Sequence, residues 1–252
     1  MKRKPLPIGI EDFGEMISQN YFYIDKTLFI KDLIDSMSKV SLFTRPRRFG
    51  KSLNMSMLQY FFDIEKNSAE LFDGLGIMSA GKQYVSHMNQ YPIICLTLKA
   101  SGKRNFRSSI NKLTEALISE FDRHSYILDS HNISSNKKND YMKILNKSAT
   151  IDDYSGSLKF LSNCLEQHHN KKVIILIDEY DVPLENAFFN GFYEEMIDFI
   201  RSLLGDALKT NPSLEFAVLT GCLRISKESI FTGLNNLDVI SILSDNYGEY
   251  YG

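Results

Sequence analysis

The chain has 252 residues, of which 43% are hydrophobic and 24% are charged, and its formal net charge is −2 at pH 7. This composition is typical of a globular protein with a substantial core and excludes a disordered chain. The near balance of 29 basic and 31 acidic residues also excludes a globally basic nucleic-acid-binding protein. Cys95, Cys164 and Cys222 lack metal-ligand spacing, so we expect buried thiols in a reducing compartment.

Residues 1–38 are expected to form a segment that leads into the main domain. Their basic start is not followed by the apolar core of a signal peptide, and no stretch of the chain is long enough to span a membrane. The sequence therefore favours a cytoplasmic protein without membrane contact. Within the segment, the spacing of apolar residues predicts a helix over about 29–37.

A loop between a predicted strand and a predicted helix carries the most informative motif. The apolar run Val40–Phe43 predicts a strand over about Val40–Thr44, and apolar spacing predicts the helix over about 51–62. Between them, Gly50-Lys51-Ser52 matches the end of a P-loop, in which backbone N–H groups at a helix start bind phosphate. Lys51 would neutralise the outer phosphates, and Ser52 would ligate Mg²⁺. The usual pattern has glycine at the position of Arg45, so the motif is incomplete on its own.

The same loop is rich in arginine. Guanidinium groups suit phosphate oxygens, so we expect one of its three arginines to contact phosphate and two to be structural. A DNA-binding patch is the least favoured interpretation, because no aromatic residues interleave with the arginines. The candidate nucleotide-binding residues of this region are Arg45, Arg47, Arg48, Phe49, Gly50, Lys51, Ser52 and Leu53.

The middle of the chain is expected to supply a strand, a helix and an insertion. Residues Tyr91–Leu98 predict a second strand, with Pro92 near its start, where the missing N–H costs least. Helical spacing follows from Phe106 to Phe121. Residues 129–153 are the most polar stretch and have one apolar interruption. They predict a short helix in a surface insertion that contains no catalytic candidate.

The run Val173–Ile177 predicts a strand buried on both faces, as in a parallel sheet. It is followed by Asp178-Glu179, which places two carboxylates at the carboxyl edge, where open α/β sheets bind ligands. This is the form of a Walker B element. Asp178 would hold Mg²⁺ opposite Ser52, and Glu179 would orient and deprotonate the attacking water.

The next predicted strand, Leu214–Thr220, would lie beside the P-loop strand. It would bring Thr220 near the γ-phosphate, where a polar sensor residue belongs. After it, Arg224 is either a sensor or finger that neutralises transition-state charge, or the partner of Glu228 in a salt bridge one helical turn away. Asp181 could orient Arg224, hold an outer water or cap the helix after the Walker B strand.

Strands and helices alternate along the chain, and a strand–helix unit separates the P-loop strand from the Walker B strand. Right-handed crossovers then build a doubly wound, mostly parallel sheet of about five strands with helices on both faces. This is an α/β, three-layer P-loop NTPase fold. The last elements would be a short helix at 225–231 and a strand at 239–242. We expect one P-loop ATPase-like domain over residues 1–252.

Four motifs are spread over nearly the whole chain, at residues 23–27, 45–53, 177–181 and 220–229. Together they resemble the AAA-ATPase-like domain of bacterial proteins that often carry a C-terminal PD-(D/E)XK nuclease-like domain. The string Arg-Pro-Arg-Arg-Phe-Gly-Lys-Ser is similar to the P-loop variant of that family, which accounts for the missing first glycine.

The resemblance implies ATP and Mg²⁺ as ligands. It places Lys51 and Ser52 at the phosphate and metal positions, Asp178 and Glu179 at the Walker B acids, and Arg224 at an arginine after the fourth strand. The nuclease-like domain is absent from these 252 residues. In a longer protein it would be the partner of this domain, and DNA would be contacted only indirectly or through it.

These patterns support three hypotheses. The first is a Mg²⁺-dependent ATPase that drives a linked effector, with Glu179, Lys51 and Arg224 as its catalytic residues. The second is a switch that binds nucleotide without hydrolysing it. The third is a structural or DNA-binding module with a vestigial P-loop. Asp25 and Lys26 belong either to a segment that wraps the nucleotide base or to a helix start, with Asp25 as its N-cap.

Overall fold

Five parallel strands form the central sheet of the computed structural model, which describes residues 4–101, 103–222, 237–241 and 247–251. In spatial order the strands are β2 (Ile93–Thr97), β3 (Val173–Asp178), β4 (Leu214–Gly221), β1 (Val40–Thr44) and β5 (Leu237–Ile240). All pairings between them are parallel. The predicted parallel sheet is confirmed, and β4 lies beside β1 as expected.

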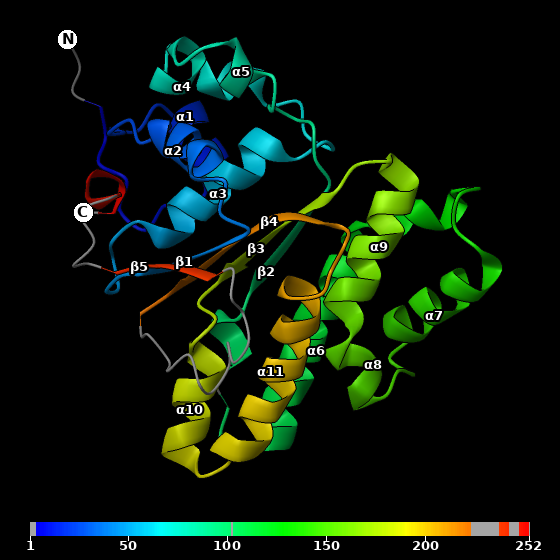
Figure 1. Cartoon of the computed structure of the whole chain (residues 1–252). Helices are drawn as coiled ribbons and strands as arrows, with labels where there is room; N and C mark the ends of the chain where they lie inside the picture. Colours follow the sequence, from blue (N-terminus) through cyan, green and yellow to red (C-terminus); the bar gives the residue numbers. More distant parts are fainter. Residues whose placement is uncertain (1–3, 102, 223–236, 242–246, 252) are drawn as a thin grey trace.

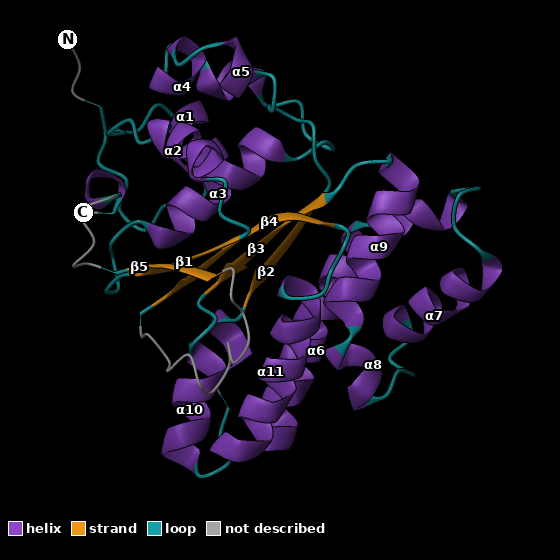
Figure 2. Cartoon of the chain, viewed as in Figure 1, coloured by secondary structure: helices purple, strands orange, loops and turns teal. Residues whose placement is uncertain are grey.

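The sheet has two buried faces, each covered by helices (Figures 1 and 2). Alternate residues of β3 enter different cores, since Ile175 packs in one cluster and Ile174 in the other. One face is covered by α1 (Phe13–Ser18), α2 (Leu28–Ser36), α3 (Lys51–Phe62), α4 (Gly76–Ser79) and α5 (Lys82–Val85). The other is covered by α6 (Phe106–Arg123), α9 (Ser157–His169), α10 (Val182–Asn190) and α11 (Tyr193–Leu208).

The strand register brings the carboxyl ends of four strands to one edge. Thr97 of β2 is paired with Asp178 of β3, and Phe43 of β1 is paired with Thr220 of β4. Loops that follow these strands therefore lie next to one another. The P-loop and the Asp178-Glu179 motif, which were expected to form one site, lie at the carboxyl ends of β1 and β3. The strand β4 lies between these two strands.

The polar insertion forms two helices on the outer side of the molecule. α7 (Ser135–Leu145) packs against α6, where the Tyr141 ring lies 4.7 Å from the Phe121 ring and its hydroxyl donates to the Phe121 carbonyl at 2.6 Å. α8 (Ile151–Ser155) begins with a capping box between Thr150 and Asp153. Both helices lie away from β1 and the edge strand β5 (Figure 1). The predicted short helix is confirmed, and α8 is an additional element.

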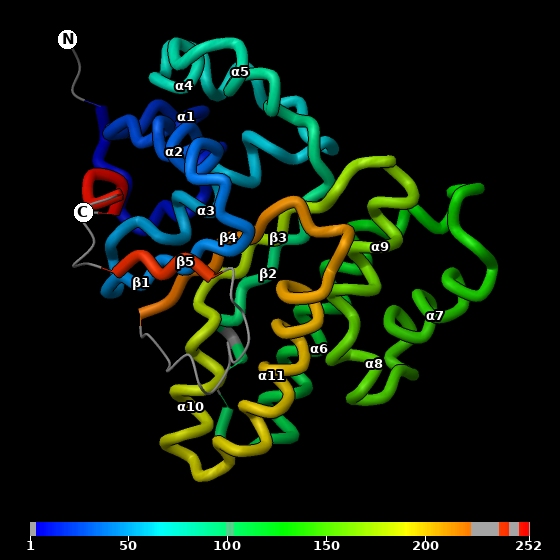
Figure 3. The backbone as a smooth tube through the Cα atoms, in the orientation of Figure 1, coloured from blue at the N-terminus to red at the C-terminus, as the bar shows by residue number. Residues whose placement is uncertain are grey.

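A turn near the chain end, η4 (Gly248–Tyr250), lies beside α2 and α3 (Figure 3). The Tyr250 carbonyl accepts hydrogen bonds from Lys26 Nζ at 2.9 Å and from Asn54 Nδ2 at 3.0 Å. The Asp25 carboxylate accepts from the backbone N–H of Gly76 at 2.6 Å, while Thr27 is the N-cap of α2. Asp25 and Lys26 thus connect the lead-in segment to distant parts of the fold, and Asp25 is not the N-cap.

Two other expectations concern the last part of the chain. The predicted helix at 225–231 and Arg224 lie outside the described residues. The last strand is found at Leu237–Ile240, slightly earlier than predicted. In the described part of the chain, none of the helices combines the length and the apolar character that crossing a bilayer requires.

Candidate nucleotide-binding site

The P-loop connects β1 to α3 over residues 45–50. Gly50 is the N-cap of α3 and has φ 73°, a left-handed conformation that glycine adopts without strain. A side-chain carbon built on Gly50 would meet no atom within 4 Å. The start of α3 therefore faces open space, where its free N–H groups and the helix dipole favour an anion. This geometry fits a bound phosphate.

Lys51, at the end of this loop, is a buried cation. Its side chain is folded under the loop, and Nζ donates to the carbonyls of Arg45 and Pro46, both at 2.9 Å. The same Nζ lies 3.5 Å from Cys222 Sγ. These partners are neutral, so a phosphate oxygen at the loop would give the ammonium an opposite charge and a stronger, charge-assisted bond.

Asp178 is hydrogen-bonded to both neighbouring elements. Its Oδ2 accepts from Ser52 Oγ at 2.6 Å, and its Oδ1 accepts from Thr220 Oγ1. One carboxylate therefore joins the start of α3, the end of β3 and the end of β4. The structure brings together three residues that the sequence placed in one site. Hydroxyl and carboxylate oxygens are the ligands that Mg²⁺ prefers, so Ser52 and Asp178 fit the metal position.

Glu179 follows the end of β3 and is half-buried, with a left-handed backbone at φ 55°. Burial raises the pKa of its carboxyl above the ordinary value of 4.5, and the adjacent Asp178 carboxylate raises it further. The positive charges of Lys99 and Lys51 act in the opposite direction. A carboxyl with a raised pKa beside the metal position is suited to accept a proton from water.

The three arginines of the loop have different environments. Arg45 is buried, and its guanidinium donates to the carbonyls of Thr44 at 3.1 Å and Ile240 at 3.0 Å. Burial also lowers its pKa. Arg47 and Arg48 are exposed, and Arg47 lies 3.9 Å from the Glu185 carboxylate. Arg45 thus has a structural role here, and phosphate contact by any arginine stays a prediction.

The remaining candidates of the loop, Phe49 and Leu53, are half-buried at its end. Asp181 is buried, and its Oδ2 accepts from the backbone N–H of Cys222 at 2.8 Å. It makes no side-chain cap hydrogen bond to α10, which it precedes. Asp181 is nevertheless the N-cap residue of α10, as one of its three predicted roles required, and its backbone carbonyl accepts from the N–H groups of Leu184 and Glu185. Its two other proposed roles stay predictions.

Two residues at this edge were missed from the sequence. Cys222 lies beside Lys51, although the sequence suggested only a buried structural thiol. Lys99 follows β2, and the backbone N–H of Leu98 donates to the Asp178 carbonyl at 3.0 Å, which places Lys99 at the site edge. Its Nζ forms an ion pair with Glu11 at 3.0 Å. Lys99 lies in none of the four motifs and Cys222 lies within the motif at 220–229, and both follow predicted strands at the carboxyl edge.

We predict that N-ethylmaleimide labels Cys222 selectively and that Mg·ATP slows the reaction. Burial raises the pKa of Cys95 to about 12 and that of Cys164 to about 11, so both stay protonated and unreactive at neutral pH. Cys222 is partly exposed and next to the phosphate-binding lysine. Peptide mass spectrometry measures the labelled positions, and Cys222→Ser is the control. Equal labelling of Cys164, or no effect of Mg·ATP, would contradict the prediction.

Comparisons with known proteins identify a family and a relative of this chain. A family model described as "Predicted AAA-ATPase" matches residues 7–231. A protein of Azotobacter chroococcum mcd 1, named "Uncharacterized protein in vnfD 5'region", is 30% identical over 248 residues, which cover 96% of this chain and 42% of that protein. The chain thus spans less than half the length of this relative. No solved structure matches. The chain belongs to the predicted AAA-ATPase family.

Proposed function

We propose that this chain is a Mg²⁺-dependent ATPase whose nucleotide cycle acts on a linked effector domain. The observation that carries the proposal is the Asp178 carboxylate, which is hydrogen-bonded to Ser52 and Thr220 at the edge that also holds Lys51 and Glu179. A hydroxyl, a carboxylate, a lysine and a second carboxylate next to a helix start are the parts that phosphoryl transfer to water requires.

Each residue would have a separate task. Lys51 would exchange the carbonyls of Arg45 and Pro46 for phosphate oxygens. Ser52 and Asp178 would hold Mg²⁺, which neutralises charge on the phosphates when it is bound. Glu179 would accept the proton of the attacking water, and the half-buried position that raises its pKa makes it a stronger base than an exposed glutamate.

The effector is the less direct part of the proposal. The Azotobacter relative is more than twice as long as the region it shares with this chain, which supports a further domain in proteins of this kind. We propose that this domain is nuclease-like, as the motif resemblance implied. Hydrolysis in the ATPase domain would then control when the partner domain acts, and DNA would be its substrate.

The test of the proposal is steady-state release of phosphate from ATP by the chain, with Mg²⁺ and with a chelator in its place. Turnover that requires Mg²⁺ and disappears in the Glu179→Gln variant is expected. One observation favours a second candidate, a switch that binds without hydrolysis. The backbone of Glu179 is in the left-handed region, which costs a non-glycine residue energy and is a strained position for the residue proposed as the base. Nucleotide binding without turnover would select this second candidate.

The pH dependence of turnover is predicted to respond to Lys99. A general base must be ionised, so activity falls as the pH drops through the pKa of Glu179, which lies above 4.5. The charge of Lys99 lowers that pKa, so Lys99→Gln is expected to move the acid limb of kcat/KM to higher pH. Lys99 forms an ion pair with Glu11. Glu11→Gln removes this ion pair but keeps the lysine charge, so it should not move the acid limb of kcat/KM to higher pH. Equal upward shifts in both variants would show that the ion pair, not the charge, is responsible.

A further inference from the structure

Two consecutive phenylalanines are exposed at the end of α10. Phe188 and Phe189 are 67% and 76% exposed, and their ring centroids lie 5.7 Å apart in an edge-to-face arrangement. The ring of Tyr193, at the start of α11, lies 6.1 Å from that of Phe188. Single exposed apolar residues are ordinary, but a contiguous group of large aromatic rings is typical of an interaction site.

Two basic loops reach α10 about one turn before this pair. From the P-loop, Arg47 Nη2 lies 3.9 Å from Glu185 Oε2, and Glu185 shares a helix face with the two phenylalanines by its spacing of three and four residues. From the loop that follows β2, the Lys103 carbonyl accepts a hydrogen bond from Asn186 Nδ2. The aromatic pair is therefore flanked by two segments that come from different strands.

These loops carry an excess of exposed cations. The exposed basic side chains are Arg47 and Arg48 of the P-loop, Lys103 and Arg104 of the loop after β2, and Arg107 in the first turn of α6, next to that loop. The acidic groups near the first turns of the facing helices are Glu185, which is paired with Arg47, the exposed Glu194 and Glu195, and Asp198, which is paired with Arg201 on the same helix. The surface is thus locally basic in a chain whose net charge is −2. We call these cations and the Phe188–Phe189 pair the α10 surface.

We infer that the α10 surface is a docking site for single-stranded nucleic acid. Unstacked bases would lie on Phe188 and Phe189, and the cations of the two loops would contact the phosphates. A duplex keeps its bases stacked, so it cannot use the aromatic pair. Neither stacking nor phosphate contact reads the base sequence or the sugar, so binding would tolerate any sequence.

This inference differs from the expectation based on the sequence. In the sequence, no aromatic residues interleave with the arginines of the P-loop, so nucleic-acid binding was the least favoured interpretation. In the fold, aromatic residues are supplied by α10, which lies far from the P-loop in the sequence. Because Arg47 and Arg48 belong to the P-loop, a bound strand would also touch the loop that holds the nucleotide. The docking site is independent of whether the chain hydrolyses ATP.

The test is fluorescence anisotropy of labelled oligo(dT) titrated with the complete chain, without nucleotide. Phe188→Ala/Phe189→Ala is expected to weaken binding by about tenfold or more, since the stacking of one base on an aromatic ring has that size. Lys103→Ala/Arg104→Ala should weaken binding and reduce the slope of log affinity against log salt by about 0.7 for each phosphate that the variant no longer neutralises. Oligo(rU) should bind similarly, and a duplex should bind less well.

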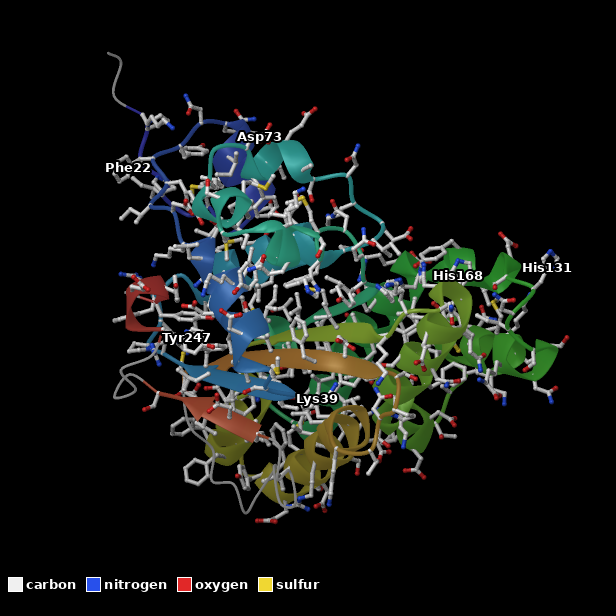
Figure 4. All side chains as sticks on the ribbon, turned by 45° about the horizontal axis from the view of Figure 1, so that its top comes forward. Phe22, Lys39, Asp73, His131, His168 and Tyr247 are labelled. Carbon is white, nitrogen blue, oxygen red and sulfur yellow. The ribbon has the colours of Figure 1, made fainter. Side chains whose placement is uncertain are left out.

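Matched controls are available elsewhere on the surface. Phe22→Ala removes another exposed phenylalanine, on the lead-in segment far from α10 (Figure 4). Lys171→Ala/Lys172→Ala removes an exposed basic pair just before the amino end of β3, whereas the P-loop lies at the carboxyl ends of the strands. Both should leave binding unchanged. The inference is overturned if the Phe188/Phe189 variant binds oligo(dT) normally, if a duplex binds better, or if the pair instead holds two copies of the chain together in sedimentation experiments.

Discussion

A Glu179→Gln variant is expected to bind ATP normally and to hydrolyse it at least about 100-fold more slowly, because positioned general bases contribute factors of this size or larger. The substitution keeps the shape of the side chain and removes its ability to accept a proton. Asp178, Ser52 and Thr220 keep their hydrogen bonds, so the metal and phosphate positions are retained. The effect should therefore fall on kcat and leave the binding constant unchanged.

The measurement combines phosphate release with calorimetric titration of ATP in the presence of Mg²⁺. Glu185→Gln is a matched control, because Glu185 lies on the next helix and contacts Arg47 without reaching Asp178. It should leave turnover within about twofold of wild type, as expected of a surface substitution. Normal turnover in Glu179→Gln would exclude this residue as the base and leave the proposed ATPase without its proton acceptor.

A Lys51→Ala variant is expected to lose ATP binding by roughly 10- to 100-fold. Hydrogen bonds to a charged group contribute about 1.5–3 kcal/mol, and each 1.4 kcal/mol is a factor of ten in affinity. The substitution also removes the donor that the carbonyls of Arg45 and Pro46 share. We therefore also expect a lower free energy of unfolding, because the two carbonyls lose the hydrogen-bond donor that they share.

Lys39→Ala separates these effects. Lys39 also donates to a backbone carbonyl, that of Glu215 at 2.7 Å, but it lies at the start of β1, at the opposite end of the strand from the P-loop (Figure 4). It should change neither ATP affinity nor, by more than about 0.5 kcal/mol, the free energy of unfolding. If Lys51→Ala bound ATP as tightly as Lys39→Ala does, the P-loop would not be a nucleotide site.

Much of the sheet was predictable because its strands are marked by local patterns. β1 was bounded correctly, and β3 begins where its apolar run begins. Such runs are continuous because a central parallel strand is buried on both faces. Ser52, Asp178 and Thr220 could be assigned to one site for a related reason. Asp178 and Thr220 lie at or near the ends of β3 and β4, and Ser52 lies at the start of the helix that follows β1. Parallel strands bring these positions to the same edge of the sheet.

The roles that were not predictable depend on residues far apart in the sequence. Arg45 looked like a phosphate contact, but its guanidinium binds the Ile240 carbonyl and lies 5.5 Å from the centre of the Tyr251 ring. His168 and His169 end α9 just before the polar residues 170–172, a position typical of solvated side chains. His169 instead shares a hydrogen bond with the Tyr126 hydroxyl at 2.8 Å, and burial lowers its pKa to about 4. Helix periodicity cannot reveal such partners, because they come from other elements.

The double attachment of Asp178 has a consequence for how sequences of this kind change over time. Its carboxylate joins two strands and the P-loop helix, so replacing it would leave Ser52 and Thr220 without their acceptor and weaken the sheet edge. A descendant that no longer needed hydrolysis would still be selected to keep this aspartate for folding. In the part of the chain that the structure describes, the side-chain hydrogen bonds that join α3, β3 and β4 through Asp178 do not involve Glu179. Among relatives, the presence of the glutamate, and not of the aspartate, should therefore separate working enzymes from inactive copies.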